Sequence, residues 1–145
     1  MLKNNKDNPK TTTLREFKFQ KRAKFIKDLY SEVNSLYSNF TEILRKKDSN
    51  ENYKIEDDKF KKSYDELLHY HYKFNNVYIK DTEVNKQINN VISNSKELNN
   101  LRQKTKIKTD VNEIKNEFRE NSKELITNFR ELSYRLNDCG VMMWI

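Results

Sequence analysis

The chain has 145 residues, the length of one domain. Its apolar fraction of 34% is below that of ordinary globular domains, and 35% of its residues are charged. One glycine and one proline disfavour a sheet with tight hairpins, and the single cysteine, Cys139, excludes a disulfide within the chain. The first 27 residues hold nine basic and two acidic side chains, so they carry the whole formal charge of +7, because the remaining residues balance at 20 basic and 20 acidic.

Residues 1–13 are polar, and we expect them to form a flexible arm. Thr13 with Glu16 three residues later makes a capping box, which predicts that the first helix starts at residue 14. This stretch has no apolar segment of the kind found in signal peptides, and the longest apolar run in the chain, residues 141–145, is too short to span a membrane. The sequence therefore predicts a cytoplasmic protein.

The first helix is predicted over residues 14–46. Its apolar residues recur at steps of three and four, the spacing of one helical face, and they are Phe25, Ile26, Leu29, Val33, Leu36, Tyr37, Phe40, Ile43 and Leu44. Extended backwards, the same face carries Arg22, Lys18 and Arg15. We therefore expect the core to begin near residue 25 and the preceding turns to form a basic helical extension.

The basic residues of this extension are the candidate site for nucleic acid or for an acidic partner. They are Arg15, Lys18, Lys21, Arg22, Lys24 and Lys27. A solvated, solubilising helix end remains the plainest interpretation of the same charges.

Three further helices are predicted over residues 57–75, 82–104 and 110–138. In the first of them, His71 falls within the apolar stripe and is expected to be a buried, hydrogen-bonded histidine, whereas His69 is expected at the surface. The helix at 82–104 has the weakest pattern, because polar residues interrupt its stripe and it is rich in asparagine; the interrupting residues are Ser95, Asn99 and Arg102.

The helix at 110–138 has the most complete end signals. Asp110 and Glu113 form a capping box at its start, and Gly140 suits the left-handed position after its last turn. Its predicted stripe is Val111, Ile114, Phe118, Leu125, Ile126, Phe129, Leu132 and Leu136.

Together these elements predict an all-α fold, an elongated antiparallel, coiled-coil-like four-helix bundle with a basic N-terminal helical extension. Residues 14–140 form its single domain, and residues 141–145 form an apolar tail. We expect that tail to fold back onto the bundle. The alternative is an exposed anchor for a partner, made by Met142, Met143 and Trp144.

Nothing in the sequence predicts a cofactor, a metal site or catalysis. His69 and His71 point about 200° apart on a helix, so they cannot clamp one ion. Residues 48–59 resemble a calcium-binding loop in part, but Tyr53 replaces the turn glycine and Lys59 replaces the bidentate glutamate. A single glycine also excludes glycine-rich phosphate loops.

The favoured function is a non-enzymatic helical interaction protein, such as an adaptor, an inhibitor or a small subunit. It would bind a protein partner through the charged extension, the apolar tail or both. One alternative is sequence-nonspecific nucleic-acid binding by basic residues within 15–27. A second is a self-assembling structural coiled coil, in which the partner is another copy of the chain.

Overall fold

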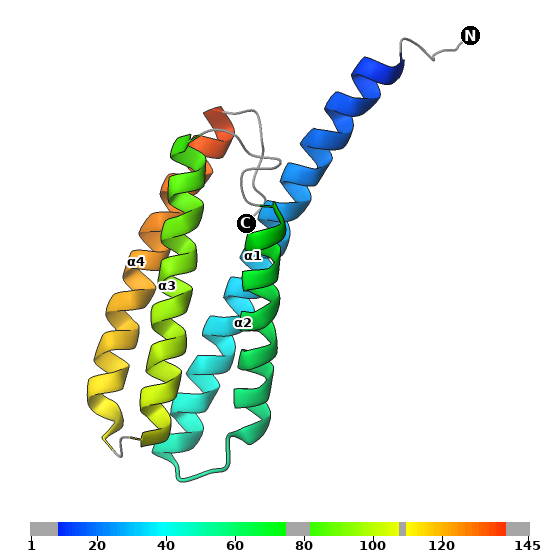
Figure 1. Cartoon of the computed structure of the whole chain (residues 1–145). Helices are drawn as coiled ribbons and strands as arrows, with labels where there is room; N and C mark the ends of the chain where they lie inside the picture. Colours follow the sequence, from blue (N-terminus) through cyan, green and yellow to red (C-terminus); the bar gives the residue numbers. More distant parts are fainter. Residues whose placement is uncertain (1–8, 75–81, 108–109, 139–145) are drawn as a thin grey trace.

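The computed structural model describes the backbone of residues 9–74, 82–107 and 110–138, and the side chains of residues 24–73, 83–107 and 110–135. This part of the chain is helical apart from short connections (Figure 1). Its helices are α1 (Pro9–Asp48), α2 (Lys54–Phe74), α3 (Thr82–Ile107) and α4 (Val111–Asp138). The predicted all-α bundle is confirmed.

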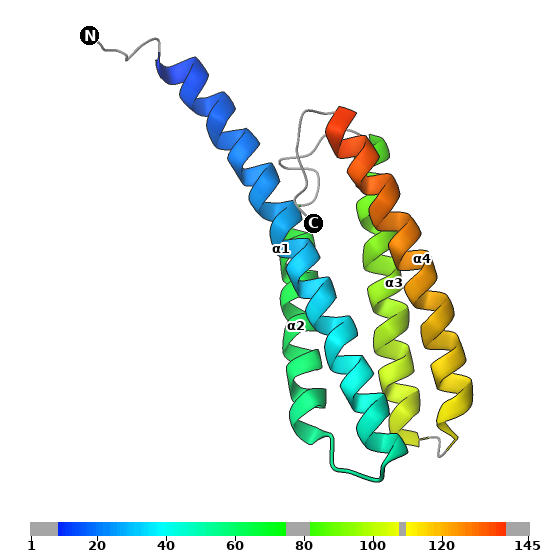
Figure 2. The same cartoon turned by 180° about the vertical axis from the view of Figure 1, so that it is seen from behind.

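The helices pair as two antiparallel hairpins, α1 with α2 and α3 with α4 (Figures 1 and 2). Contacts between the hairpins are far fewer than contacts within them. They join α1 to both α3 and α4, and α2 to α3, whereas α2 and α4 do not meet within the described residues. In cross-section, α2 and α4 therefore lie at opposite corners of the bundle.

One continuous apolar core runs along the bundle, and the predicted stripe of α1 is its largest contributor. Phe25 and Ile26 are each 2% exposed, so the core begins at the predicted position. The Phe40 ring lies 6.2 Å from that of Phe60 on α2 and 4.9 Å from that of Phe118 on α4. Phe40 thus contacts both hairpins, about two turns from the end of α1.

The start of α1 differs from the prediction. The helix begins at Pro9, so Thr13 lies inside it and does not cap it, and residues 9–13 do not belong to a flexible arm. Proline suits the first helical turn because its missing N–H would have no partner there. Likewise, α2 begins at Lys54, before the predicted residue 57, and α3 continues to Ile107, beyond the predicted residue 104.

The end of α1 is a Schellman turn built on Asn50. The Glu51 N–H donates to the Lys46 carbonyl at 2.7 Å and the Asn50 N–H donates to the Lys47 carbonyl at 3.1 Å, the two bonds that define this cap. Asn50 has φ 56°, a left-handed conformation that asparagine tolerates better than most residues. Asn52 Oδ1 then accepts from the Lys54 N–H at 2.8 Å, and α2 begins.

The predicted cap of α4 is confirmed at Asp110, whose Oδ1 accepts from the Asn112 N–H at 3.0 Å. Ile126 is wrong as a core residue, since it is 56% exposed. The neighbouring Leu125 faces the core instead, and adjacent residues on a helix point about 100° apart. His71 is hydrogen-bonded, with Nε2 2.9 Å from Asn89 Oδ1, but it is half-buried and not a core residue.

The polar residues that interrupt the α3 stripe are mostly inside the bundle. Ser95 and Arg102 are buried, and Arg102 Nη1 donates to Asp57 Oδ1 of α2 at 2.8 Å. The Arg102 guanidinium also lies 5.3 Å from the centre of the Phe60 ring. Burial alone would raise the pKa of Asp57, but its hydrogen bonds to Arg102 and Lys106 outweigh this and lower it. The contact therefore ties the hairpins together through a charged pair.

A network of hydrogen-bonded polar side chains joins α1, α3 and α4. The Tyr37 hydroxyl donates to Asn121 Oδ1, and Asn121 Nδ2 donates to the Asn94 carbonyl at 3.0 Å. Asn128 Nδ2 donates to Asn94 Oδ1 at 2.6 Å. Burial, with smaller contributions from nearby Glu97 and Glu124, raises the pKa of Tyr37, so its hydroxyl stays protonated as the donor.

Replacing Asn50 tests the cap of α1. Asn50→Ala should lower the free energy of unfolding by about 1 kcal/mol, because alanine tolerates the left-handed conformation poorly. Asn50→Gly should be neutral or slightly stabilising. Urea unfolding followed by circular dichroism measures both changes, and Ser49→Ala is the control at a neighbouring exposed residue. Equal losses for Ser49→Ala and Asn50→Ala would contradict this account.

Replacing Asp57 tests the charged contact between hairpins. Asp57→Ala should cost about 3 kcal/mol because it leaves buried Arg102 without its carboxylate. Asp58→Ala, at the adjacent exposed carboxyl paired with Lys54, should cost less than about 1 kcal/mol. Since the pKa of Asp57 is lowered from 3.8, its contribution is present above that value and is lost as the pH falls through the folded-state pKa. Urea titrations at neutral and acidic pH check both points.

Candidate interaction surfaces

The first turns of α1 extend beyond the bundle. The last turn of α2 lies beside residues 24–28 of α1, where Lys24 and Phe25 line a hollow together with Tyr70 and Lys73. Residues 9–23 continue the helix by about 22 Å beyond that level. No other described helix runs beside this segment (Figures 1 and 2). The predicted helical extension is therefore present.

The structure places the predicted basic residues on this one helix, and among the described residues Lys73 of α2 lines the same hollow as Lys24. Arg15, Lys18, Lys21 and Arg22 lie on the extension, and their side chains are outside the described ones. Lys24 and Lys27 are exposed where the extension meets the bundle. Lys24 Nζ pairs with Asp28 at 2.9 Å, and this hydrogen bond and charge raise the pKa of Lys24.

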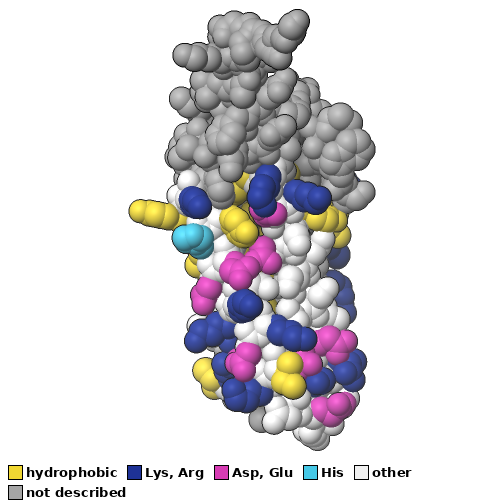
Figure 3. Space-filling model, turned by 90° about the vertical axis from the view of Figure 1, so that its right-hand side faces the viewer, with side chains coloured by type: hydrophobic (Ala, Val, Ile, Leu, Met, Phe, Trp, Pro, Cys, Tyr) yellow, Lys and Arg dark blue, Asp and Glu magenta, His cyan; other side chains and the backbone are white. Residues whose placement is uncertain are grey.

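The charges on the bundle itself are mixed. On the face that lies at the right in Figure 1, basic and acidic side chains are interspersed (Figure 3). Several pair between elements, such as Lys46 with Glu56 at 2.8 Å and Lys115 with Asp48 at 2.8 Å. The extension consequently differs from the body in carrying one sign of charge in excess.

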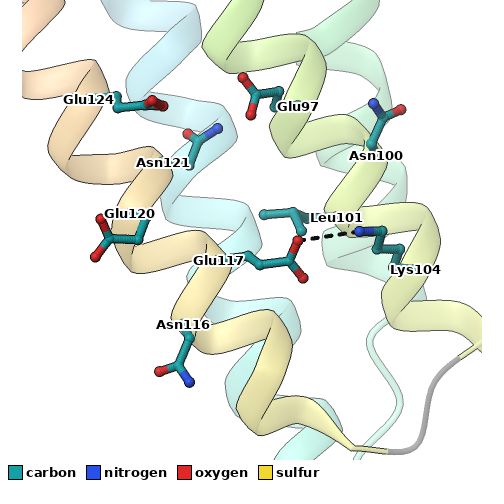
Figure 4. Close-up of a pocket in the computed structure, with 9 residues that line it drawn as sticks. All are labelled: Glu97, Asn100, Leu101, Lys104, Asn116, Glu117, Glu120, Asn121 and Glu124. Atoms are coloured by element: carbon teal, nitrogen blue, oxygen red, sulfur yellow. Dashed lines mark hydrogen bonds and ion pairs between the residues drawn. The ribbon is translucent and has the colours of Figure 1, made fainter.

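A groove of ≈ 450 Å³ lies between α3 and α4 (Figure 4). Its lining residues are Glu97, Asn100, Leu101, Lys104, Asn116, Glu117, Glu120, Asn121 and Glu124. Lys104 Nζ pairs with Glu117 Oε1 at 3.3 Å, and Lys123, outside the lining, pairs with Glu120 at 3.4 Å. The excess of carboxylates makes this groove favourable for cationic groups.

This acidic groove was not predicted from the sequence. The sequence pattern that could have predicted it is the spacing of Glu117, Glu120 and Glu124. They are three and then four residues apart, which places three carboxylates on one face of a helix. Glu97 joins them only because α3 and α4 pack side by side, so that part needed the fold.

A second groove of ≈ 530 Å³ lies between α1 and α4 and is mainly apolar. The Tyr30 ring of α1 meets the Phe129 ring of α4 edge-on at 5.2 Å. Ile126 and Tyr134 of α4 also line the groove and are 56% and 65% exposed. It was not predicted, because Ile126 was assigned to the core.

The predicted apolar anchor, Met142, Met143 and Trp144, lies outside the described residues, as do Cys139 and Gly140. Among the side chains that are described, no three of His, Cys, Asp or Glu gather closely enough to hold a metal ion. Within the same residues, no helix combines the length and apolar character needed to cross a membrane.

No family model, curated protein or solved structure matches this chain. The surfaces above therefore have to be interpreted from their own geometry and charge.

Glu32 of α1 and Glu66 of α2 form a carboxyl pair in which the protonation equilibrium of Glu32 is shifted. Burial, reinforced by the neighbouring Glu66 carboxyl and by Asp28, raises the pKa of Glu32 from 4.5 to about 7. One carboxyl oxygen of Glu32 is buried without a hydrogen-bond partner among the described residues. Folding therefore favours the protonated form of Glu32.

This pair should make stability depend on pH near neutrality. Folding takes up a proton between the unfolded pKa of about 4.5 and the folded pKa of about 7, so stability should fall as the pH rises through that window. Glu32→Gln should remove most of this dependence and stabilise the protein by about 1 kcal/mol at mildly alkaline pH, allowing for solvent screening of a partly exposed pair.

Urea unfolding across that pH range measures the effect. Glu131→Gln, at an exposed glutamate of α4, is the control and should leave the pH dependence unchanged. A wild-type stability that is flat between the two pKa values would refute the shifted Glu32.

Proposed function

We propose that this chain is a non-enzymatic interaction protein whose bundle holds the basic end of α1 away from its surface, where it binds an acidic patch on a protein partner. The observation that carries the proposal is the continuation of α1 past the end of α2 (Figure 1). By sequence, residues 9–23 of this extension hold five basic residues and one acidic residue, a net charge of +4.

The bundle prepares the extension for binding. An isolated helix of this length is marginal in water because nucleation is costly. Here the extension propagates from residues packed in the core, beginning at Phe25. A helix ordered before binding loses less conformational entropy on association than a disordered arm, and its positive charge speeds encounter with acidic surfaces.

A protein partner is favoured over nucleic acid by the composition of the extension. It contains Leu14, Phe17 and Phe19 among its basic residues, and apolar and aromatic anchors within charged surroundings are typical of protein interfaces. It contains two arginines, Arg15 and Arg22, whereas specific base recognition relies most often on arginine. Nucleic acid is therefore the second candidate, and self-assembly is the third.

Charge reversal on the extension tests the proposal. The double substitution Lys18→Glu with Arg22→Glu should reduce binding of a short fluorescein-labelled polyglutamate peptide at least tenfold, and wild-type affinity should fall as salt rises. Lys59→Glu with Lys61→Glu, at exposed lysines of α2, changes the net charge equally and should keep near wild-type affinity. Fluorescence anisotropy measures the peptide affinity of the wild type and of both double variants.

Two results would overturn the proposal. One is equal loss in both double variants, which would make net charge, and not the extension, responsible. The other is absence of peptide binding while a labelled single-stranded oligonucleotide binds with a steep salt dependence, which would favour nucleic acid. Light scattering on the same samples shows whether the chain binds another copy of itself instead.

A further inference from the structure

The apolar groove between α1 and α4 is open among the described residues. Its walls come from both hairpins. Tyr30 and Asn34 line it on α1, and the residues that line it on α4 are Leu125, Ile126, Phe129, Arg130, Ser133 and Tyr134. Ile126 and Tyr134 expose more than half of their surface beside it. Contiguous exposed apolar surface is a common feature of sites where another apolar segment docks.

The groove lies close to the end of α4. Ser133 and Tyr134 line it one turn before the helix ends at Asp138. Phe129 lies nine residues before Asp138, about 14 Å back along the helix axis, and Leu125 lies about 20 Å back. A segment that leaves α4 and reverses direction would therefore enter the groove from its Tyr134 end.

The chain continues with a segment of suitable length and composition. From Gly140, where the chain would reverse, to Trp144 an extended chain spans at most about 14 Å, which is enough to bring the tryptophan side chain to the level of Phe129. The sequence there is Cys-Gly-Val-Met-Met-Trp-Ile, whose last five residues are all apolar. Gly140 is the residue type that best allows the left-handed turn needed to reverse the chain after a helix.

We propose that residues 141–145 dock in the α1–α4 groove of their own chain, with Trp144 packed near Ile126 and Phe129. Methionine adapts to irregular apolar surfaces, and tryptophan brings the largest apolar area of any side chain. Docking covers Ile126 and Tyr134 and adds a third element to the contact between α1 and α4. It also means that the segment is engaged within the chain and does not serve as a free anchor. This inference is independent of what the basic extension binds.

The single tryptophan of the chain makes the docking measurable in the full-length protein. With excitation at the red edge of the tryptophan band, emission reports Trp144 alone. In the wild type, emission should be blue-shifted and shielded from acrylamide relative to the urea-unfolded chain. Ile126→Glu and Tyr134→Glu should each shift emission to the red and raise the quenching constant severalfold, because each places a charge at the groove.

Ile55→Glu is the matched control, since Ile55 is 66% exposed on α2 and does not line the groove; this variant should behave as the wild type. Circular dichroism establishes that each variant is folded. Wild-type emission equal to that of the unfolded chain would overturn the proposal. A shielded tryptophan that neither groove variant affects would place the segment elsewhere and would also overturn it.

Diluting the protein distinguishes docking of the chain's own residues 141–145 from docking of the same residues of a second copy. Emission that is independent of concentration supports docking within one chain. A red shift on dilution would assign the groove to the same segment of a second copy and overturn docking within the chain.

Discussion

The ion pair between Asp57 and Arg102 is a largely buried charged contact between the two hairpins. Each hairpin packs extensively within itself, whereas contacts between hairpins are few. Apolar contacts tolerate sliding, but a buried guanidinium needs its carboxylate within hydrogen-bond distance. The pair joins α2 to α3, and the Phe60 ring under Arg102 connects it to Phe40 in the core.

The hydrogen bonds around Asn94 and Asn121 set the other side of the bundle in the same way. They connect α3 and α4 to Tyr37 of α1. A one-residue shift of α4 would leave buried amide groups without partners, and each such group costs free energy comparable to a lost hydrogen bond. The two polar contacts together select one packing of hairpins that the apolar residues alone would specify weakly.

The surfaces available for binding follow from the same packing. On one side, α4 contributes Glu117, Glu120 and Glu124 to an acidic groove with α3. On another side, it contributes Ile126, Phe129 and Tyr134 to an apolar groove with α1. The basic extension of α1 lies apart from both. The acidic groove, the apolar groove and the basic extension therefore lie on separate parts of the bundle.

The sequence by itself determined the four helices, the apolar face of α1 and the beginning of the core at Phe25, because helical periodicity and charge segregation are local properties. It missed the start of α1 at Pro9, since a capping box at Thr13 and a proline in the first turn predict different boundaries. It identified the residues of the basic extension, whose interaction remains a prediction. The tertiary structure alone decided which polar residues are buried. In the sequence, Arg102 and Ser95 interrupt the apolar stripe of α3, whereas Ile126 extends that of α4. In the structure, Arg102 and Ser95 are buried and Ile126 is exposed. Burial depends on what lies across from a residue, and one helix's own sequence does not contain that information.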